Sequence, residues 1–389
     1  MTGARHLKRL DWPVVVAVLA LVVFSWPYMR SASYRSGPGG RGYYTSSPKK
    51  QVVWIAAGVL VALLLLVPAY RTLSELSALL YLLGLAMLVV VMLFGRVING
   101  AKSWLVLPAN VRLQPSEFAK ITTLIALAHY LALEQRARRT GHVLGALALT
   151  AVPAVMIAAQ PDLGTAMMFV PLVVAMVFVA GARLKLLAVL AALSMVMLPV
   201  AWLGMTSTQR SRIGVWLQQG RPLTAAERVG RFHHLIQSKV AIGSGRWSGK
   251  GLGQGSQNRL NYLGFRNTDF IFAVICEEAG FVGANVVVGL YLLLAASGLN
   301  IARRCREPVG RLIAVGVVTQ FVFQAYVNIA MTLGLLPIVG VTLPFVSYGG
   351  SSTLASFMGI GLLLNVGLRR PRITFSPSEL GVALAWPGY

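Results

Sequence analysis

The chain has 389 residues, of which 56% are hydrophobic and only 12% are charged. Soluble globular proteins carry about 25% charged residues, so this chain could not cover its apolar surface with charge in water. It has 35 Lys and Arg against 11 Asp and Glu, a net charge of +24, and its two cysteines exclude a disulfide-rich scaffold. These figures predict an integral membrane protein.

Ten apolar stretches are predicted to cross the bilayer as helices, since about 20 residues span its hydrocarbon core. We therefore expect an all-α polytopic membrane protein, with residues 1–389 forming a single integral membrane domain. The stretches cover residues 12–29, 52–69, 76–94, 118–133, 143–159, 165–181, 186–205, 270–301, 312–333 and 341–368.

Basic residues in the short loops favour an orientation with both ends of the chain in the cytoplasm. With the N-terminus inside, 16 Lys and Arg lie on the inner side and 9 in the shorter outer loops. Residues 206–268 then form a large extracytoplasmic loop between the seventh and eighth helices, and residues 369–389 form a cytoplasmic tail. The large loop does not enter the count, because long loops cross the membrane largely regardless of charge.

The large loop carries 10 Lys and Arg and a single acid, Glu227. Such a surface attracts phosphate-bearing ligands or lipid headgroups, unless it is only a solvated face. Thr224 and Glu227 fit a capping box, which marks a helix start. Apolar residues then repeat at helical spacing: Val229, Phe232, Ile236 and Val240. The pattern predicts an amphipathic helix on the membrane surface, with packing of the stripe against the bundle as the alternative.

The same loop ends in a glycine-rich segment over residues 243–255. It is not a P-loop, because Lys250 is followed by Gly251 rather than by Ser or Thr. Its backbone N–H groups, with Arg246 and Lys250 among them, could hold a phosphate, and a merely flexible loop is the alternative.

Carboxylates are rare in this chain, and one at membrane depth is costly and usually functional. Glu117 and Lys120 are three residues apart, so they can pair on one face of a helix. Asp162 lies in the break between the fifth and sixth stretches. Asp269 comes directly before the eighth, where the helix dipole and nearby Arg266 would favour its ionisation and burial would oppose it.

Polar residues interrupt the last two stretches. Gln320, Gln324, Asn328 and Thr332 form a stripe at spacing four, which predicts either interhelical hydrogen bonds or the lining of a cavity. Residues 334–340 and 343–352 break the apolar pattern, and irregular backbone at this depth must lie within protein or along a wet cavity. No Cys, His and Asp have the spacing of metal ligands, so no cofactor is evident; a divalent cation is compatible with the sequence but not indicated by it.

Five motifs, in order along the chain, closely resemble the SEDS family (shape, elongation, division and sporulation). They are Gly100-Ala-Lys-Ser-Trp104, Leu113-Gln-Pro-Ser-Glu-Phe-Ala-Lys120, Gln160-Pro-Asp-Leu-Gly-Thr165, Thr268-Asp-Phe-Ile-Phe-Ala-Val274 with Glu277-Glu278, and Leu343-Pro-Phe-Val-Ser-Tyr-Gly-Gly-Ser-Ser352. The glycine-rich segment is more similar to the elongation branch, RodA, than to the division branch, FtsW.

This resemblance implies a ten-helix peptidoglycan glycosyltransferase at the outer face of the bacterial cytoplasmic membrane, acting in elongation and cell shape. It implies lipid II as substrate, undecaprenyl diphosphate as leaving group, and a class B penicillin-binding protein, which is a transpeptidase, as partner. The matched catalytic position is Asp269. The chain departs from the family just before it, reading Leu263-Gly-Phe-Arg-Asn267 where members usually carry Leu-Pro-Glu-x-His.

We therefore expect Asp269 to be the general base of an inverting transfer, with a plain helix cap as the alternative role. The substrate-binding candidates come from the basic loop and the matched motifs: Arg212, Lys250, Arg210, Arg246, Trp104, Glu117, Lys120, Asp162, Ser347 and Ser351. Membrane lipids are expected partners, and nucleic acid is not, because the basic face is extracytoplasmic. Two other functions stay open: a flippase or transporter of the same lipid, and a non-catalytic scaffold for the transpeptidase.

Overall fold

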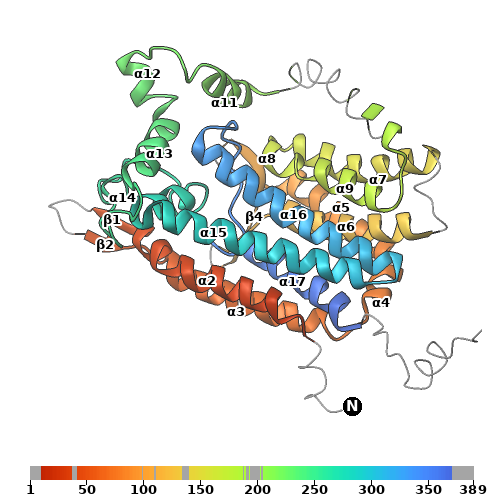
Figure 1. The fold of residues 1–389 in the computed structure, drawn as a ribbon. Coiled ribbons are helices and arrows are strands. Elements are labelled where there is room, and N and C mark those ends of the chain that lie inside the picture. Colours follow the sequence, from red (N-terminus) through yellow and green to blue (C-terminus); the bar gives the residue numbers. More distant parts are fainter. Residues whose placement is uncertain are drawn as a thin grey trace, which may run out of the picture.

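A computed structural model describes residues 10–36, 42–98, 100–108, 111–133, 140–186, 188–189, 192, 202 and 205–369. Over these residues the chain is a bundle of long helices lying side by side (Figure 1). Seven are long and apolar enough to cross a membrane. They are α2 (Trp12–Ala32), α3 (Ser47–Leu65), α5 (Ser77–Phe94), α7 (Thr140–Ala158), α15 (Ile271–Arg304), α16 (Pro308–Leu333) and α17 (Gly350–Arg369).

Three further helices complete the described bundle: α6 (Pro115–Ala132), which carries two charged residues, and the shorter α8 (Leu163–Ala166) and α9 (Phe169–Val179). The short α4 (Tyr70–Glu75) lies at what we call the inner end. The polytopic helical fold is therefore confirmed. The seventh predicted stretch lies largely outside the described residues, as do residues 1–9 and the tail over 370–389, so the number ten stays a prediction.

Burial sorts the helices into a centre and a lipid-facing shell. In α16 and α17, 72% and 78% of the residues in the apolar 18-residue stretch of each helix are buried, against 22% in α3 and in α5. A helix that is apolar all round and buried by its neighbours belongs to the middle of a bundle. Glycines allow the closest approaches: a Cβ on Gly361 of α17 would lie 2.9 Å from the backbone of Ala62 in α3.

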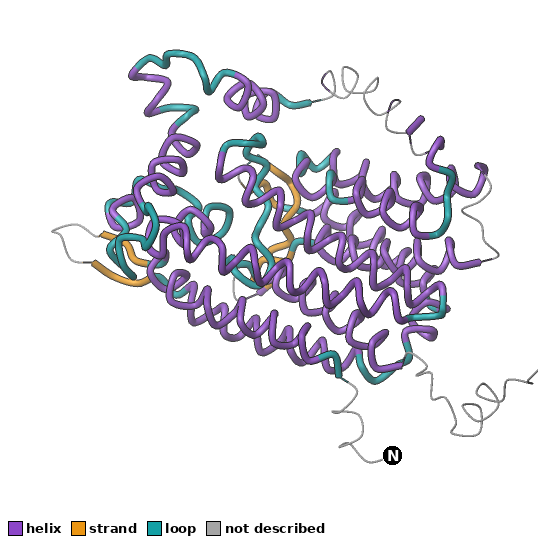
Figure 2. Tube along the Cα trace, in the orientation of Figure 1, coloured by secondary structure: helices purple, strands orange, loops and turns teal. Residues whose placement is uncertain are grey.

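Short strands, which the all-helical prediction did not include, form two small antiparallel sheets, orange in Figure 2. One pairs β1 (Tyr34–Ser36) with β2 (Gly42–Tyr44) just after α2. The other has the order β3 (Arg96–Ile98), β4 (Ala101–Leu107) and β5 (Val111–Leu113), and connects α5 to α6. These segments are three to seven residues long and lack the apolar runs that dominate the rest of the chain.

The large loop is mostly helical, with α11 (Ser207–Leu217), α12 (Ala225–Val229), α13 (His233–Ser244) and α14 (Ser256–Arg259). The capping box of Thr224 and Glu227 is confirmed, but Gly230 ends that helix after five residues. The predicted stripe continues into α13. Phe232 is buried together with Leu235 and Val215, and Ile236 packs against them, whereas Val240 is exposed. Part of the stripe thus packs on protein, which was the alternative, and a position of this helix on the membrane surface stays a prediction.

The last predicted stretch also begins later than expected. Residues 341–349 form an irregular loop, and α17 starts at Gly350. Figure 1 shows α13, α14, β1 and β2 gathered at the end of the bundle where α2 finishes and α15 begins, which we call the outer end.

Candidate active site

Asp269 lies in a tight turn, residues 265–269, that leads into α15; we call it the Asp269 turn. Phe265 has a positive φ of 51°, and its carbonyl oxygen accepts the N–H groups of Thr268, Asp269 and Phe270 at 3.0–3.2 Å. The N-cap of α15 is Phe270, without a side-chain capping bond. The carboxylate of Asp269 therefore does not act as the N-cap of this helix.

The irregular loop before α17 and the polar stripe of α16 hold the Asp269 turn in place. Ser347 Oγ donates to the Thr268 carbonyl at 2.6 Å and accepts the N–H of Leu343 at 2.8 Å. Asn328 Nδ2 donates to the carbonyls of Asp269 and Val341 at 2.9 and 2.6 Å. Within the stripe, Asn328 thus bonds the neighbouring turn and loop, whereas the Thr332 hydroxyl donates to the Ile329 carbonyl of its own helix. The choice between interhelical hydrogen bonds and a cavity lining stays a prediction for the stripe as a whole.

The Asp269 carboxylate itself faces the backbone at Gly340. A Cβ at Gly340, which has φ of +75°, would lie 3.5 Å from Asp269 Oδ2. Burial raises the pKa of Asp269 to about 6, although Thr268 and the positive charge of Arg212 act in the opposite direction. A carboxylate with this pKa is ionised at neutral pH and is a stronger base than an ordinary aspartate.

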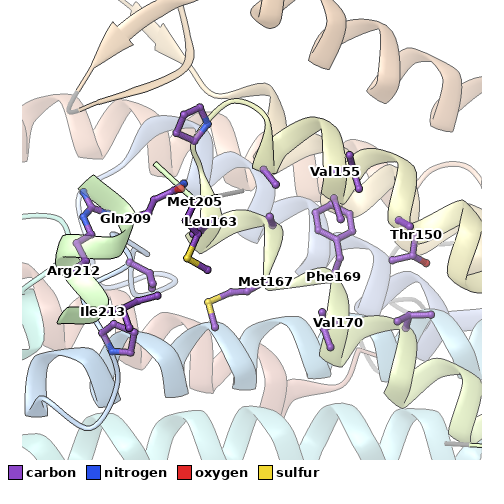
Figure 3. A pocket seen from close by; sticks show the side chains of 18 of the residues that line it. Thr150, Val155, Leu163, Met167, Phe169, Val170, Met205, Gln209, Arg212 and Ile213 are labelled. Atoms are coloured by element: carbon purple, nitrogen blue, oxygen red, sulfur yellow. The ribbon is translucent and has the colours of Figure 1, made fainter. Parts of the chain in front are cut away.

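A cavity of about 700 Å³ opens beside this region, between α7, α8, α9, α11 and residues 337–339. Figure 3 shows its two ends: Arg212 and Gln209 of α11 at one, and Thr150, Phe169 and Val170 at the other. The lining is almost entirely aliphatic and aromatic apart from the Arg212 end. Val339 lines the cavity and the next residue, Gly340, faces the Asp269 carboxylate, so the carboxylate lies next to the cavity, and the charge of Arg212 acts on it.

A second polar cluster lies at the start of α6. Lys120 Nζ is 3.0 Å from Glu117 Oε2, with both side chains buried, so the predicted pair is confirmed. Lys120 also donates to Gln324 Oε1 at 3.3 Å, and Gln324 Nε2 donates to the Thr342 carbonyl at 3.0 Å. The pair is thereby connected to the same loop that holds the Asp269 turn.

Asp162 caps α8 and joins this cluster. It accepts the N–H of Thr165 at 3.1 Å and Gln114 Nε2 at 2.8 Å. Burial raises the pKa of Asp162, and the neighbouring carboxylate of Glu117 adds to the rise. Ser351 Oγ accepts the backbone N–H of Gln114 at 2.9 Å, so this serine positions the start of α6.

Lys250 and Arg246 lie in the glycine-rich segment, which is built into a break in α15. The backbone N–H groups of Lys250 and Gly251 donate to the carbonyls of Glu277 and Glu278 at 3.0 Å, beside Gly280 with its φ of +67°. Lys250 Nζ is 2.7 Å from Glu277 Oε1, and Glu277 is fully buried. The segment is therefore packed against α15 through its backbone and through Lys250, and phosphate binding by it stays a prediction. Arg246 is exposed there, and its carbonyl accepts the N–H of Phe281.

The remaining candidates make contacts with other residues. Arg210 lies over the Trp202 ring at 6.0 Å and donates to its carbonyl. Trp104 lies in β4, opposite Arg96 in β3. Arg266, expected to favour ionisation of Asp269, is fully buried and donates instead to the carbonyls of Ala32 and Tyr34.

Sequence reasoning did not single out Gln114, which lies in a matched motif, or Thr342, which comes directly before one. Gln114 joins Asp162 to Ser351, and Thr342 accepts from Gln324. A polar residue directly before a buried helix start was the available signal for Gln114.

The fold and this arrangement define a multi-pass helical membrane protein with a carboxylate beside an apolar cavity. Residues 12–371 match the family model of FtsW, RodA and SpoVE, described as cell cycle proteins. The chain belongs to this family, which is the SEDS family that its motifs resemble.

Two curated relatives match over nearly their whole lengths. The peptidoglycan glycosyltransferase MrdB of Escherichia coli (strain K12) is 34% identical over 369 residues, covering 95% of this chain and 96% of the relative. The peptidoglycan glycosyltransferase RodA of Treponema pallidum is 30% identical, covering 94% and 99%.

Solved structures agree with these relatives. The crystal structure of the rod shape determining protein RodA of Thermus thermophilus matches with a TM-score of 0.68 and 31% identity, covering 93% of this chain and 98% of that one. A chain from the structure described as "Structural coordination of polymerization and crosslinking by a peptidoglycan synthase complex" matches with a TM-score of 0.74 and 32% identity, covering 92% and 97%.

Proposed function

We propose that this chain is a peptidoglycan glycosyltransferase that polymerises lipid II into glycan strands during cell elongation. The observation that carries the proposal is the half-buried Asp269 carboxylate beside a long apolar cavity that has Arg212 at one end. The names of its relatives support the activity class, and the chain covers almost their full length. We place the activity at the outer face of the bacterial cytoplasmic membrane, with both termini cytoplasmic, from the distribution of Lys and Arg.

The reaction is an inverting displacement at the anomeric carbon of the donor sugar. Asp269 accepts the proton of the acceptor hydroxyl, and the hydroxyl oxygen forms the new bond to that carbon. The bond between the anomeric carbon and the diphosphate oxygen breaks at the same time, and undecaprenyl diphosphate leaves with the electron pair. A base with a pKa of about 6 is suited to this step, because it is ionised at neutral pH yet retains affinity for a proton.

Arg212 is our first candidate for the developing charge on the diphosphate. It lies at one end of the cavity, its charge acts on Asp269, and a guanidinium can bind a diphosphate through two hydrogen bonds. The cavity beyond it is lined by aliphatic and aromatic side chains, a surface that favours a polyprenyl chain over water. Lys250 is a weaker candidate, because its ammonium already bonds Glu277 and Ser256.

Glu117, Lys120, Asp162, Ser347 and Ser351 support the site rather than reach the donor. Their hydrogen bonds run to the loop over 340–349, to the start of α6 and to the Asp269 turn. Such a supporting shell holds a base within the tolerance that proton transfer needs.

For the partner, we propose a class B penicillin-binding protein, whose membrane helix packs on the lipid-facing side of α15 and α16. One structural neighbour comes from a complex that coordinates polymerisation and crosslinking. Apolar side chains such as Leu292 and Val322 are exposed on these helices and carry no charge that would oppose such packing.

The test is polymerisation of labelled lipid II by purified protein in detergent, with and without the partner. Polymer from the wild type and none from Asp269→Asn would support the proposal. A flippase instead acts only across a sealed bilayer and makes no polymer in detergent. A scaffold yields polymer only when an active polymerase is added, and in that case Asp269→Asn is as good as the wild type.

A further inference from the structure

Arg266 is the largest fully buried side chain in the described part of the chain. It lies within the Asp269 turn, three residues before the carboxylate, and takes no part in the reaction as proposed above. A buried cation is expensive unless hydrogen bonds satisfy its donors, so a fully buried arginine at this place calls for a reason.

Arg266 donates hydrogen bonds to carbonyl and side-chain amide oxygens. Arg266 Nε donates to the carbonyl of Ala32 at 2.9 Å, and Nη2 donates to the carbonyl of Tyr34 and to Asn261 Oδ1, the latter at 2.7 Å. Ala32 is the last residue of α2, where helix carbonyls lack intrahelical partners and the dipole favours a cation. Tyr34 begins β1. The guanidinium therefore joins the Asp269 turn to the outer end of the first described helix.

The Asp269 turn is held from two sides. On one side, Ser347 and Asn328 bind the carbonyls of Thr268 and Asp269. On the other, Arg266 bonds the outer end of α2, and Asn267 Nδ2 donates to Ser33 Oγ at the longer distance of 3.4 Å. Without Arg266 the turn would lose its hydrogen bonds to the carbonyls of Ala32 and Tyr34, and Phe265 would have to keep its positive φ with less support.

We propose that Arg266 is a positioning residue for glycosyl transfer: it ties the Asp269 turn to the outer end of α2 and so holds the carboxylate of Asp269 beside Arg212. This inference rests on the proposed role of Asp269 as the general base. Arg266 touches no reacting atom. Its loss would displace the base rather than the donor-binding groups, and a displacement of about 1 Å can cost about 100-fold in rate.

The experiment compares Arg266→Met and Arg266→Lys with the wild type in lipid II polymerisation, scaled to the monodisperse folded fraction. We expect Arg266→Met to lower kcat at least tenfold while KM for lipid II stays within twofold. Arg266→Lys keeps the charge and one hydrogen bond, so it should recover part of kcat. Asn261→Gly removes one acceptor of the guanidinium, and glycine tolerates the positive φ of that position. It should lower kcat by a smaller factor than Arg266→Met, and it tests the inference if Arg266→Met fails to fold.

A matched control is Asn365→Ala at the inner end. Asn365 is also fully buried and also ties backbone groups together, bonding Tyr70 N and the carbonyls of Leu65 and Pro68. We expect this variant to lose thermal stability but to keep the kcat of the wild type per folded molecule. If Arg266→Met and Asn261→Gly also keep that kcat, Arg266 is only structural and the inference is wrong.

The two levels of the proposal fail in different ways. An active Asp269→Asn variant would remove the general base and with it the reason for positioning. An inactive Asp269→Asn variant together with a fully active Arg266→Met variant would leave the base in place and overturn the role of Arg266 alone.

Discussion

Replacing Asp269 by Asn should abolish polymerisation and at the same time stabilise the fold. Burial raises the pKa of Asp269 from 3.8 to about 6, so the folded state binds this proton more tightly than the unfolded chain does. By linkage, the stabilisation of the folded state by this bound proton is fully present below pH 3.8, and it is lost as the pH rises through about 6. At neutral pH the ionised side chain therefore destabilises the folded state.

The size of the effect follows from the two pKa values. At pH 7.5 the difference corresponds to about 3 kcal/mol, and at pH 5 to about half of that, because the folded carboxyl is then mostly protonated. Asn has nearly the same shape and no charge. The variant should therefore unfold at a higher temperature than the wild type at pH 7.5, and the gain should shrink at pH 5.

The measurement is a pair of thermal unfolding curves in detergent at the two pH values, combined with lipid II polymerisation. If Asp269 is the base and its charge destabilises the fold, Asp269→Asn should have a higher unfolding temperature and make no polymer. A structural cap predicts an unchanged unfolding temperature and near-normal polymer, because Asn caps a helix as well as Asp does. Either of those last two results would refute the assignment of Asp269 as an ionised, half-buried base.

Arg212→Gln should move the pH midpoint of polymerisation upward from about 6, because Arg212 lowers the pKa of Asp269. The same variant should raise KM for lipid II. Arg228→Gln, which changes an exposed residue in the same loop, should have neither effect. Glu117→Ala leaves Lys120 buried without its partner at 3.0 Å and should cost about 3–5 kcal/mol of stability. The double variant Glu117→Ala with Lys120→Met should recover much of that loss. Equal unfolding temperatures for the single and double variants would contradict a buried pair. A photo-crosslinker at Leu292 of α15 should capture the transpeptidase helix, and capture only from α3 or α5 would place the docking face elsewhere.

Much of the architecture follows from the chain alone. Apolar runs of membrane length leave a backbone little choice except helices, because hydrocarbon offers no hydrogen bonds to N–H and C=O groups. The spacing of three between Glu117 and Lys120 likewise predicts their pairing, since residues at that spacing meet on any α-helix. The resemblance to the SEDS family and the position of Asp269 in its motif are also properties of the sequence.

Other features depend on contacts between distant segments. Phe232 of the apolar stripe would suit a membrane surface equally well, and only its packing with Val215 and Ile338 makes it protein core. Lys250 has the charge and glycine context of a phosphate ligand, but a buried glutamate from α15 occupies its ammonium. Charge near Asp269 comes from Arg212, 57 positions away in the chain, while adjacent Arg266 is turned to the end of α2. Local sequence specifies hydrogen bonding and periodicity along one segment, whereas the partner of a side chain is decided by which segments the bundle brings together.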